Sequence, residues 1–179
     1  MATQTQRAIQ VAKTISGNAP FQLWLPEAAS QSFKAGAVVK LNSSGQVIAG
    51  TFDGSTDDTQ ILGVAAGDAS NIASPTADNK IPVYIADDDT IFVGNLYTSQ
   101  TSAWTDIGSA VGLRTVTVGS QTIYCVDKTK VGGATDKRRV IIIDLDTRSG
   151  LPAIGGVGDI QAGVLFMFLD VYTKMSYTS

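Results

Sequence analysis

The side chains that usually carry out catalysis are scarce in this sequence of 179 residues. It contains no histidine and a single cysteine, Cys125, and its acidic residues lie mostly in turn-like segments beside Gly, Ser and Thr. Proton transfer near neutral pH, nucleophilic attack and transition-metal binding draw mostly on His, Cys or clustered carboxylates. The sequence therefore predicts a structural or binding protein, with no enzymatic activity and no cofactor.

Cys125 itself stands in the apolar run 123–126. A free cysteine in such a run is usually a buried and unreactive thiol. One cysteine also cannot form an internal disulfide, so we expect folding in a reducing compartment.

Two acidic stretches are the candidates for a metal site. Asp87, Asp88 and Asp89 offer the carboxylate oxygens that Ca²⁺ prefers, but neighbouring residues of an extended chain point to opposite faces. The stretch 53–58 lacks the ligand spacing and the closing Glu of an EF-hand loop. We expect two solvated polar turns and no metal. The least favoured alternative is a metal- or carboxylate-dependent hydrolase that uses the three consecutive aspartates.

A basic cluster follows the cysteine and consists of Lys128, Lys130, Lys137, Arg138 and Arg139. It lacks interleaved aromatic residues, and the net charge of −3 opposes attraction to phosphate, so we expect no nucleic-acid partner. The cluster is interpreted as a solvated rim or, alternatively, as one half of a subunit contact that faces acidic loops.

Composition indicates one compact unit. The chain is 44% hydrophobic and only 16% charged, which is typical of a globular domain. Its longest strictly apolar run, 164–169, is far shorter than the roughly 20 residues that cross a bilayer, and the N-terminus has no signal-peptide pattern. We expect no membrane partner, an extended or partly helical N-terminal arm over residues 1–15, and a single domain over residues 16–179.

Short apolar runs with strand periodicity fill most of the chain and are separated by Gly, Ser, Asn and Asp. Strands are expected at 37–41, 46–48, 60–65, 80–85, 90–93, 111–118, 122–126, 139–145 and 163–171. The pattern predicts an all-β fold: a compact β-barrel or β-sandwich-like domain of short antiparallel strands. The last two strands carry apolar residues on both faces and should be central.

Two positions suggest irregular pairing. Pro82 cannot donate to a ladder, so its strand should be an edge strand or should turn that nitrogen outward. The apolar positions of 111–118 change phase near Arg114, which predicts a β-bulge there.

Segments 27–41, 45–47, 61–65, 106–113 and 138–145 combine Phe-x-x-Gly, a strand, a Gly turn, a second strand and Leu-Gly-Val-Ala. Together they resemble the capsid decoration, or cement, proteins of tailed bacteriophages. The resemblance implies a β-rich virion protein, made in the bacterial host cytoplasm, on the capsid exterior. It also implies a homotrimer that binds the major capsid protein and stabilises the lattice, without catalytic residues.

With that role, we expect the capsid contacts to come from Arg7, Ile9 and Lys13 of the arm and from the early aromatics Phe21 and Trp24. Core packing is the competing interpretation of the two aromatics.

The alternative function is a carbohydrate-recognising β-sandwich module, which could also be displayed on a virion. Trp24, Trp104 or Tyr97 would serve as its stacking platforms.

Overall fold

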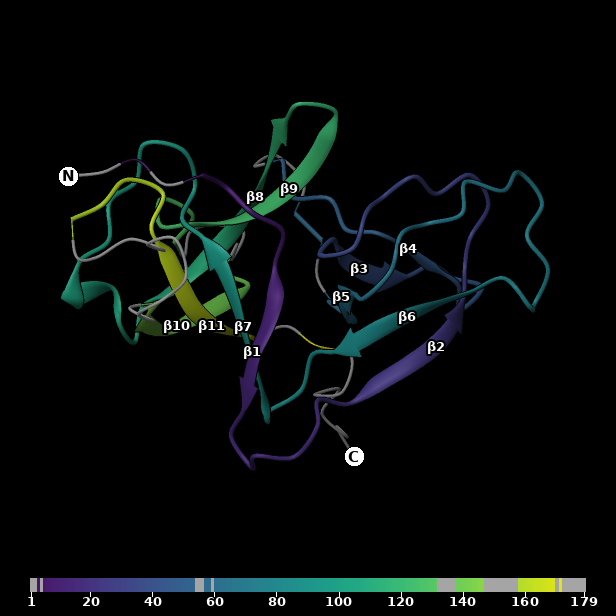
Figure 1. Ribbon diagram of the computed structural model, residues 1–179, viewed down its shortest axis with the longest axis horizontal. Coiled ribbons are helices and arrows are strands. Elements are labelled where there is room, and N and C mark those ends of the chain that lie inside the picture. Colours follow the sequence, from purple (N-terminus) through teal and green to yellow (C-terminus); the bar gives the residue numbers. More distant parts are fainter. Residues whose placement is uncertain are drawn as a thin grey trace.

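The protein is an all-β molecule of two antiparallel sheets set side by side, as the computed structural model shows (Figure 1). The structure describes residues 3, 5–53, 57–58, 60–131, 138–146, 158–169 and 171. The strands are β1 Gln10–Thr14, β2 Gln22–Pro26, β3 Val38–Leu41, β4 Val47–Ala49, β5 Gly63–Ala65, β6 Lys80–Ile85, β7 Thr90–Asn95, β8 Ala110–Val118, β9 Gln121–Asp127, β10 Val140–Leu145 and β11 Gly163–Phe168. The predicted fold class is confirmed, and the described part contains only one short 3-10 turn, η1 (Trp104–Asp106), and no α-helix.

The two sheets are built from separate stretches of chain, except for the first strand. The five-stranded sheet has the order β2-β6-β5-β3-β4, and the six-stranded sheet has the order β1-β7-β11-β10-β8-β9. The predicted arm therefore contains an extended strand, β1, which joins the six-stranded sheet. The chain then forms the whole five-stranded sheet before it returns to the six-stranded one. The strands expected to be central, β10 and β11, are indeed flanked on both sides.

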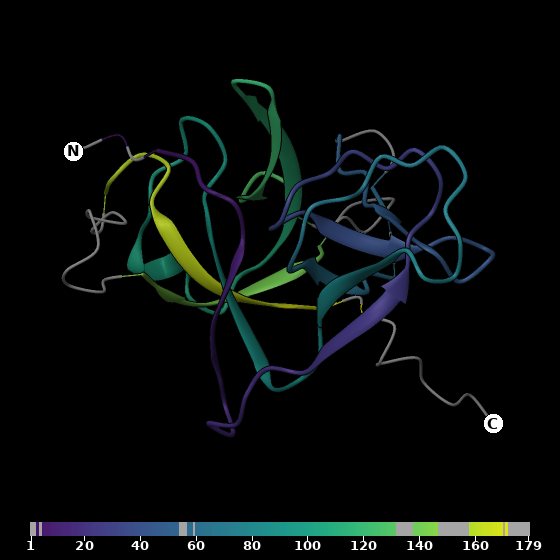
Figure 2. The same ribbon diagram turned by 45° about the vertical axis from the view of Figure 1, so that its right-hand side comes forward.

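The six-stranded sheet curls back on itself (Figure 2). Its edge strand β9 meets the chain just after β7, where Leu96 pairs in parallel with Val126 and the Tyr97 N–H donates to the Val126 carbonyl at 2.7 Å. This curl encloses part of one hydrophobic core that is continuous across both sheets. Phe92 and Phe168 pack edge to face inside it, with ring centroids 5.0 Å apart.

Pro82 lies in an interior strand and not at an edge. β6 is flanked by β2 and β5, but β5 ends at Ala65, so Pro82 lies opposite Ala66 beyond the end of the paired segment. The Ala66 N–H donates to the Pro82 carbonyl at 2.8 Å, and the lack of an N–H on Pro82 removes only the return bond of this last pair.

The prediction of a β-bulge near Arg114 is wrong. Pairing between β8 and β9 runs without a shift from Gly112 to Val118. The phase of the apolar pattern changes because this hairpin leaves the core and projects from the molecule, so that Val118 is exposed (Figure 1). The shifts in register lie instead in β1 and in β10.

The loop after β4 forms the junction between the sheets. The ring of Phe52 is buried and meets Tyr124 of β9 edge to face, with centroids 6.0 Å apart. The Tyr124 hydroxyl donates to the Gly50 carbonyl at 3.0 Å, and the Thr115 N–H donates to the Phe52 carbonyl at 3.2 Å. A loop of one sheet is thus fixed to two strands of the other.

A buried ion pair completes this junction. Lys130 Nζ lies 2.8 Å from Asp57 Oδ2, and the two side chains are only 4% and 1% exposed. Lys130 also donates to the Leu113 carbonyl, and the Arg139 guanidinium donates to the Asp58 carbonyl at 2.7 Å. The end of the acidic loop that was expected to be solvated is therefore internal.

Removal of the lysine charge from this pair should destabilise the fold. We expect Lys130→Met to lower the free energy of unfolding by roughly 3–5 kcal/mol, because Asp57 would stay buried without the lysine. The double variant Lys130→Met/Asp57→Leu should recover much of that loss. Urea unfolding followed by circular dichroism measures both, and a single variant as stable as the wild type would contradict the role of the pair.

Gly63 allows β5 and β6 to pair. A Cβ at this position would lie 1.9 Å from the Tyr84 carbonyl oxygen. We expect Gly63→Ala to lower the free energy of unfolding by at least about 3 kcal/mol. The control Gly45→Ala has open space around its Cβ but a φ of +73°, so it should cost only about 1–2 kcal/mol. Equal losses in the two variants would contradict the steric explanation.

Candidate functional site

The three predicted contact residues of the arm differ in exposure. The side chains of Arg7 and Lys13 are exposed, whereas Ile9 is 2% exposed and belongs to the core. The Arg7 N–H donates to the side-chain oxygen of Asn95 at 2.9 Å, which fixes the arm beside β7. Only the two cations of this set are therefore available to a partner.

The two early aromatics are on the surface. Phe21 is 55% exposed and Trp24 is 63% exposed, so the competing interpretation of core packing does not hold for them. Leu23 between them is 37% exposed. Within the described residues, no other strand pairs with the outer side of β2. We call this strand, with the exposed Phe21, Leu23 and Trp24, the β2 edge.

The β2 edge presents apolar groups on both faces of the sheet. Trp24 lies directly opposite Pro82, and Tyr84, two residues further along β6, shares that face. Leu23 lies on the other face, as does Phe21, whose carbonyl accepts from Ile85. A surface that touches this edge would therefore meet apolar side chains on both sides of the strand.

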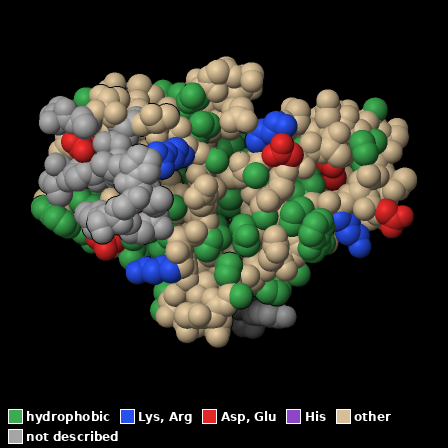
Figure 3. Space-filling model, viewed as in Figure 1, with side chains coloured by type: hydrophobic (Ala, Val, Ile, Leu, Met, Phe, Trp, Pro, Cys, Tyr) green, Lys and Arg blue, Asp and Glu red, His purple; other side chains and the backbone are tan. Residues whose placement is uncertain are grey.

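An apolar groove continues the Trp24 face toward the arm. It has a volume of about 400 Å³ and lies between Ile9 and Val11 on one side and Val64 and Tyr84 on the other. Figure 3 shows hydrophobic side chains gathered around a hollow in the middle of this face. The groove floor is tight at Gly36, where a Cβ would come within 2.5 Å of the arm. Tyr84 belongs to both the groove and the Trp24 face, so the two surfaces are continuous.

The basic cluster does not form the predicted rim. Lys130 and Arg139 are buried in the junction between the sheets, and Lys128 pairs with an acidic side chain at 2.7 Å. Arg138 is exposed, and Lys137 lies outside the described residues. Two of these cations therefore pair with carboxylates of the same chain, and a third is buried.

The three consecutive aspartates also serve the fold. Asp87 accepts from the N–H groups of Asp89 and Thr90, which closes the turn between β6 and β7. Asp89 accepts from the hydroxyl and the N–H of Ser16, at 2.6 and 2.7 Å, and these bonds lower the pKa of that carboxyl. Across the described ranges, no three His, Cys, Asp or Glu side chains gather closely enough to hold a metal ion.

The stacking platforms of the carbohydrate alternative do not form one site. Trp104 is 61% exposed on η1, at the opposite end of the molecule from Trp24 (Figures 1 and 2). Tyr97 is half-buried, and the Arg114 guanidinium lies over its ring at 4.7 Å from the centroid.

Cys125 is fully buried in β9. Burial, helped by the charge of Asp127, raises the pKa of its thiol to about 12. The thiol is therefore protonated at neutral pH and cannot act as a nucleophile there.

Comparison with protein-family models, with curated proteins and with solved structures finds no match to this chain. No helix in the described segments has the length and apolar character needed to span a membrane.

The buried thiol makes stability depend on pH. Its folded pKa of about 12 exceeds the ordinary value of 9.0, so its contribution is complete below pH 9 and declines as pH rises toward 12. Between neutral pH and about pH 10.5, the wild type should lose roughly 2 kcal/mol more unfolding free energy than Cys125→Ala. Urea unfolding of both proteins at the two pH values measures this difference, and equal losses would contradict it.

Proposed function

We propose that the protein is a non-enzymatic virion component that binds the exterior of a tailed-phage capsid and stabilises the lattice of major capsid subunits. The observation that carries this proposal is the β2 edge, an open strand with Phe21, Leu23 and Trp24 exposed. The resemblance of the sequence to capsid decoration proteins supports the choice of the major capsid protein as the partner.

The β2 edge is more stable when it is covered by another protein than when it is exposed to water. Open edge strands of soluble proteins are normally shortened, charged or covered, and neighbouring exposed apolar side chains on such an edge favour an interaction site. The exposed charges Arg7 and Lys13 lie on the same arm that lines the groove, so polar contacts would flank the apolar ones. Protein–protein interfaces commonly have this arrangement, with an apolar centre that excludes water and a polar rim.

Attachment of this kind stabilises a lattice by mass action. A protein that binds the expanded shell better than the unexpanded one favours the expanded state by its difference in binding free energy. Weak contacts made by many copies, or by the three arms of a homotrimer, then act together. A trimer would also cover edge strands with copies of the same chain.

The test compares two exposed tryptophans at opposite ends of the molecule. The wild type should bind expanded heads of the phage that encodes it and raise the temperature at which they rupture. Trp24→Ala should weaken binding by roughly 30-fold or more, because a buried interface tryptophan typically contributes 2 kcal/mol or more. Trp104→Ala is the matched control and should change binding less than about threefold.

Two results would count against the proposal: failure to bind heads at both low and high salt, or equal losses in the two tryptophan variants. Native mass measurement tests the oligomer separately, and a particle near three times 18.7 kDa is expected.

A further inference from the structure

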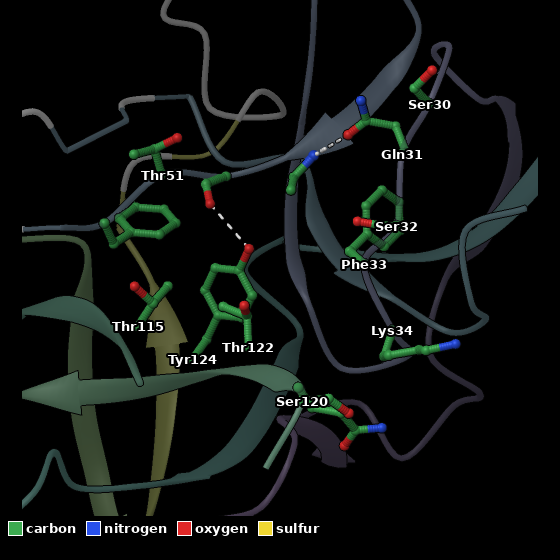
Figure 4. A pocket seen from close by; sticks show the side chains of 14 residues that line it. Ser30, Gln31, Ser32, Phe33, Lys34, Thr51, Thr115, Ser120, Thr122 and Tyr124 are labelled. Carbon is green, nitrogen blue, oxygen red and sulfur yellow. Dashed lines mark hydrogen bonds between the residues drawn. The ribbon is translucent and has the colours of Figure 1, made fainter. Parts of the chain in front are cut away.

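A second cleft, distinct from the apolar groove, lies where the two sheets meet. It has a volume of about 400 Å³, within the range of small-molecule sites. One wall is the loop between β2 and β3, and the other is formed by the loop after β4 and by the β8–β9 hairpin (Figure 4). Its walls thus come from both sheets.

Hydroxyl groups dominate the lining of this cleft. Besides the Tyr124 hydroxyl, six serine and threonine hydroxyls line it, those of Ser30, Ser32, Thr51, Thr115, Ser120 and Thr122. Within the part of the chain that the structure describes, none of these six hydroxyls is engaged in a hydrogen bond, so they are available to a ligand. Each hydroxyl can donate one hydrogen bond and accept two.

The cleft carries almost no net charge. No carboxylate lines it, and its only ionised side chain is Lys34. That ammonium group already pairs with Asp68 at 2.8 Å outside the cleft. An anionic ligand such as a phosphate would therefore meet no uncompensated cation.

An apolar floor lies beneath the hydroxyls. It consists of the half-buried Phe33 and the buried rings of Phe52 and Tyr124. The Tyr124 hydroxyl is committed to the Gly50 carbonyl, and burial raises the pKa of this phenol to about 12, so the ring stays neutral. Because Phe52 and Tyr124 are only 1% and 3% exposed, they support the floor from below, and Phe33 is the aromatic ring that a ligand can touch. The C–H face of a sugar ring fits against Phe33 beside the polar wall.

The cleft is preorganised. Gln31 is held at both ends of its amide, which donates to the Ala29 carbonyl and accepts from the Ala49 N–H, each at 3.2 Å. On the opposite wall, the Tyr124 end of the β8–β9 hairpin is fixed to the Gly50 carbonyl. A ligand would therefore order few protein groups on binding.

We propose that this cleft binds a neutral saccharide, with the hydroxyls of both walls bonded to sugar hydroxyls and a sugar face resting against Phe33. Sugar hydroxyls, like those of serine and threonine, both donate and accept, so a wall of hydroxyls matches them without any charge. This site is separate from the exposed tryptophans and from the β2 edge, and it does not depend on the proposed attachment to a capsid.

The experiment uses the full-length, ¹⁵N-labelled protein. A glycan array carrying neutral oligosaccharides is screened first, and maltotriose, tri-N-acetylchitotriose and every array hit are then titrated up to about 10 mM by NMR. We expect at least one of these saccharides to shift amide signals of residues 30–34, 49–52 and 115–124. The double variant Thr51→Val/Thr122→Val, which keeps the shape and removes two hydroxyls, should weaken that binding about tenfold or more.

Three controls make the result decisive. Thr98→Val removes an exposed hydroxyl outside the cleft and Trp24→Ala changes the β2 edge; both should leave saccharide affinity unchanged. Inorganic phosphate should not shift the cleft signals. The proposal is overturned if no neutral saccharide binds, if the double variant binds as well as Thr98→Val, or if phosphate binds more tightly than every saccharide tested.

Discussion

The arrangement of this molecule depends on one buried contact between its sheets, the ion pair of Lys130 with Asp57 and the adjoining insertion of Phe52 against Tyr124. Phe52 and Asp57 belong to the loop between β4 and β5 of the five-stranded sheet. Tyr124 lies in β9 of the six-stranded sheet, and Lys130 follows that strand. Because two charges can leave water only when their geometry and remaining hydrogen bonds are well satisfied, this contact tolerates few relative positions of the sheets. The apolar core is far less selective, since hydrophobic burial is non-directional.

The relative position of the sheets also sets the shape of two surfaces, the apolar groove beside the arm and the hydroxyl-lined cleft. The apolar groove lies between the arm, which is part of the six-stranded sheet, and β5 and β6 of the other sheet. The hydroxyl-lined cleft likewise has one wall from each sheet. Neither surface exists within a single sheet, so the contact that sets their relative position also sets the shape of both sites.

Local patterns were sufficient to predict much of the fold, because alternation and turn residues act over a few positions. The hairpin of 37–41 and 46–48 and the central strands near 140 and 165 followed from such patterns. The junction could not be predicted, since Lys130 and Asp57 are 73 residues apart and basic residues are usually solvated. β2 was also missed: its few residues, ending at a proline, become a strand only by pairing with β6.

The two proposed sites use opposite physical chemistry. At the β2 edge and the groove, burial of apolar area would stabilise a complex, whereas in the cleft the hydroxyl groups must exchange water for equally good partners. Because the groove and the cleft each have walls from both sheets, a ligand in either of them would bind the assembled arrangement better than a loosened one. Occupation of either one would therefore stabilise the junction by mass action.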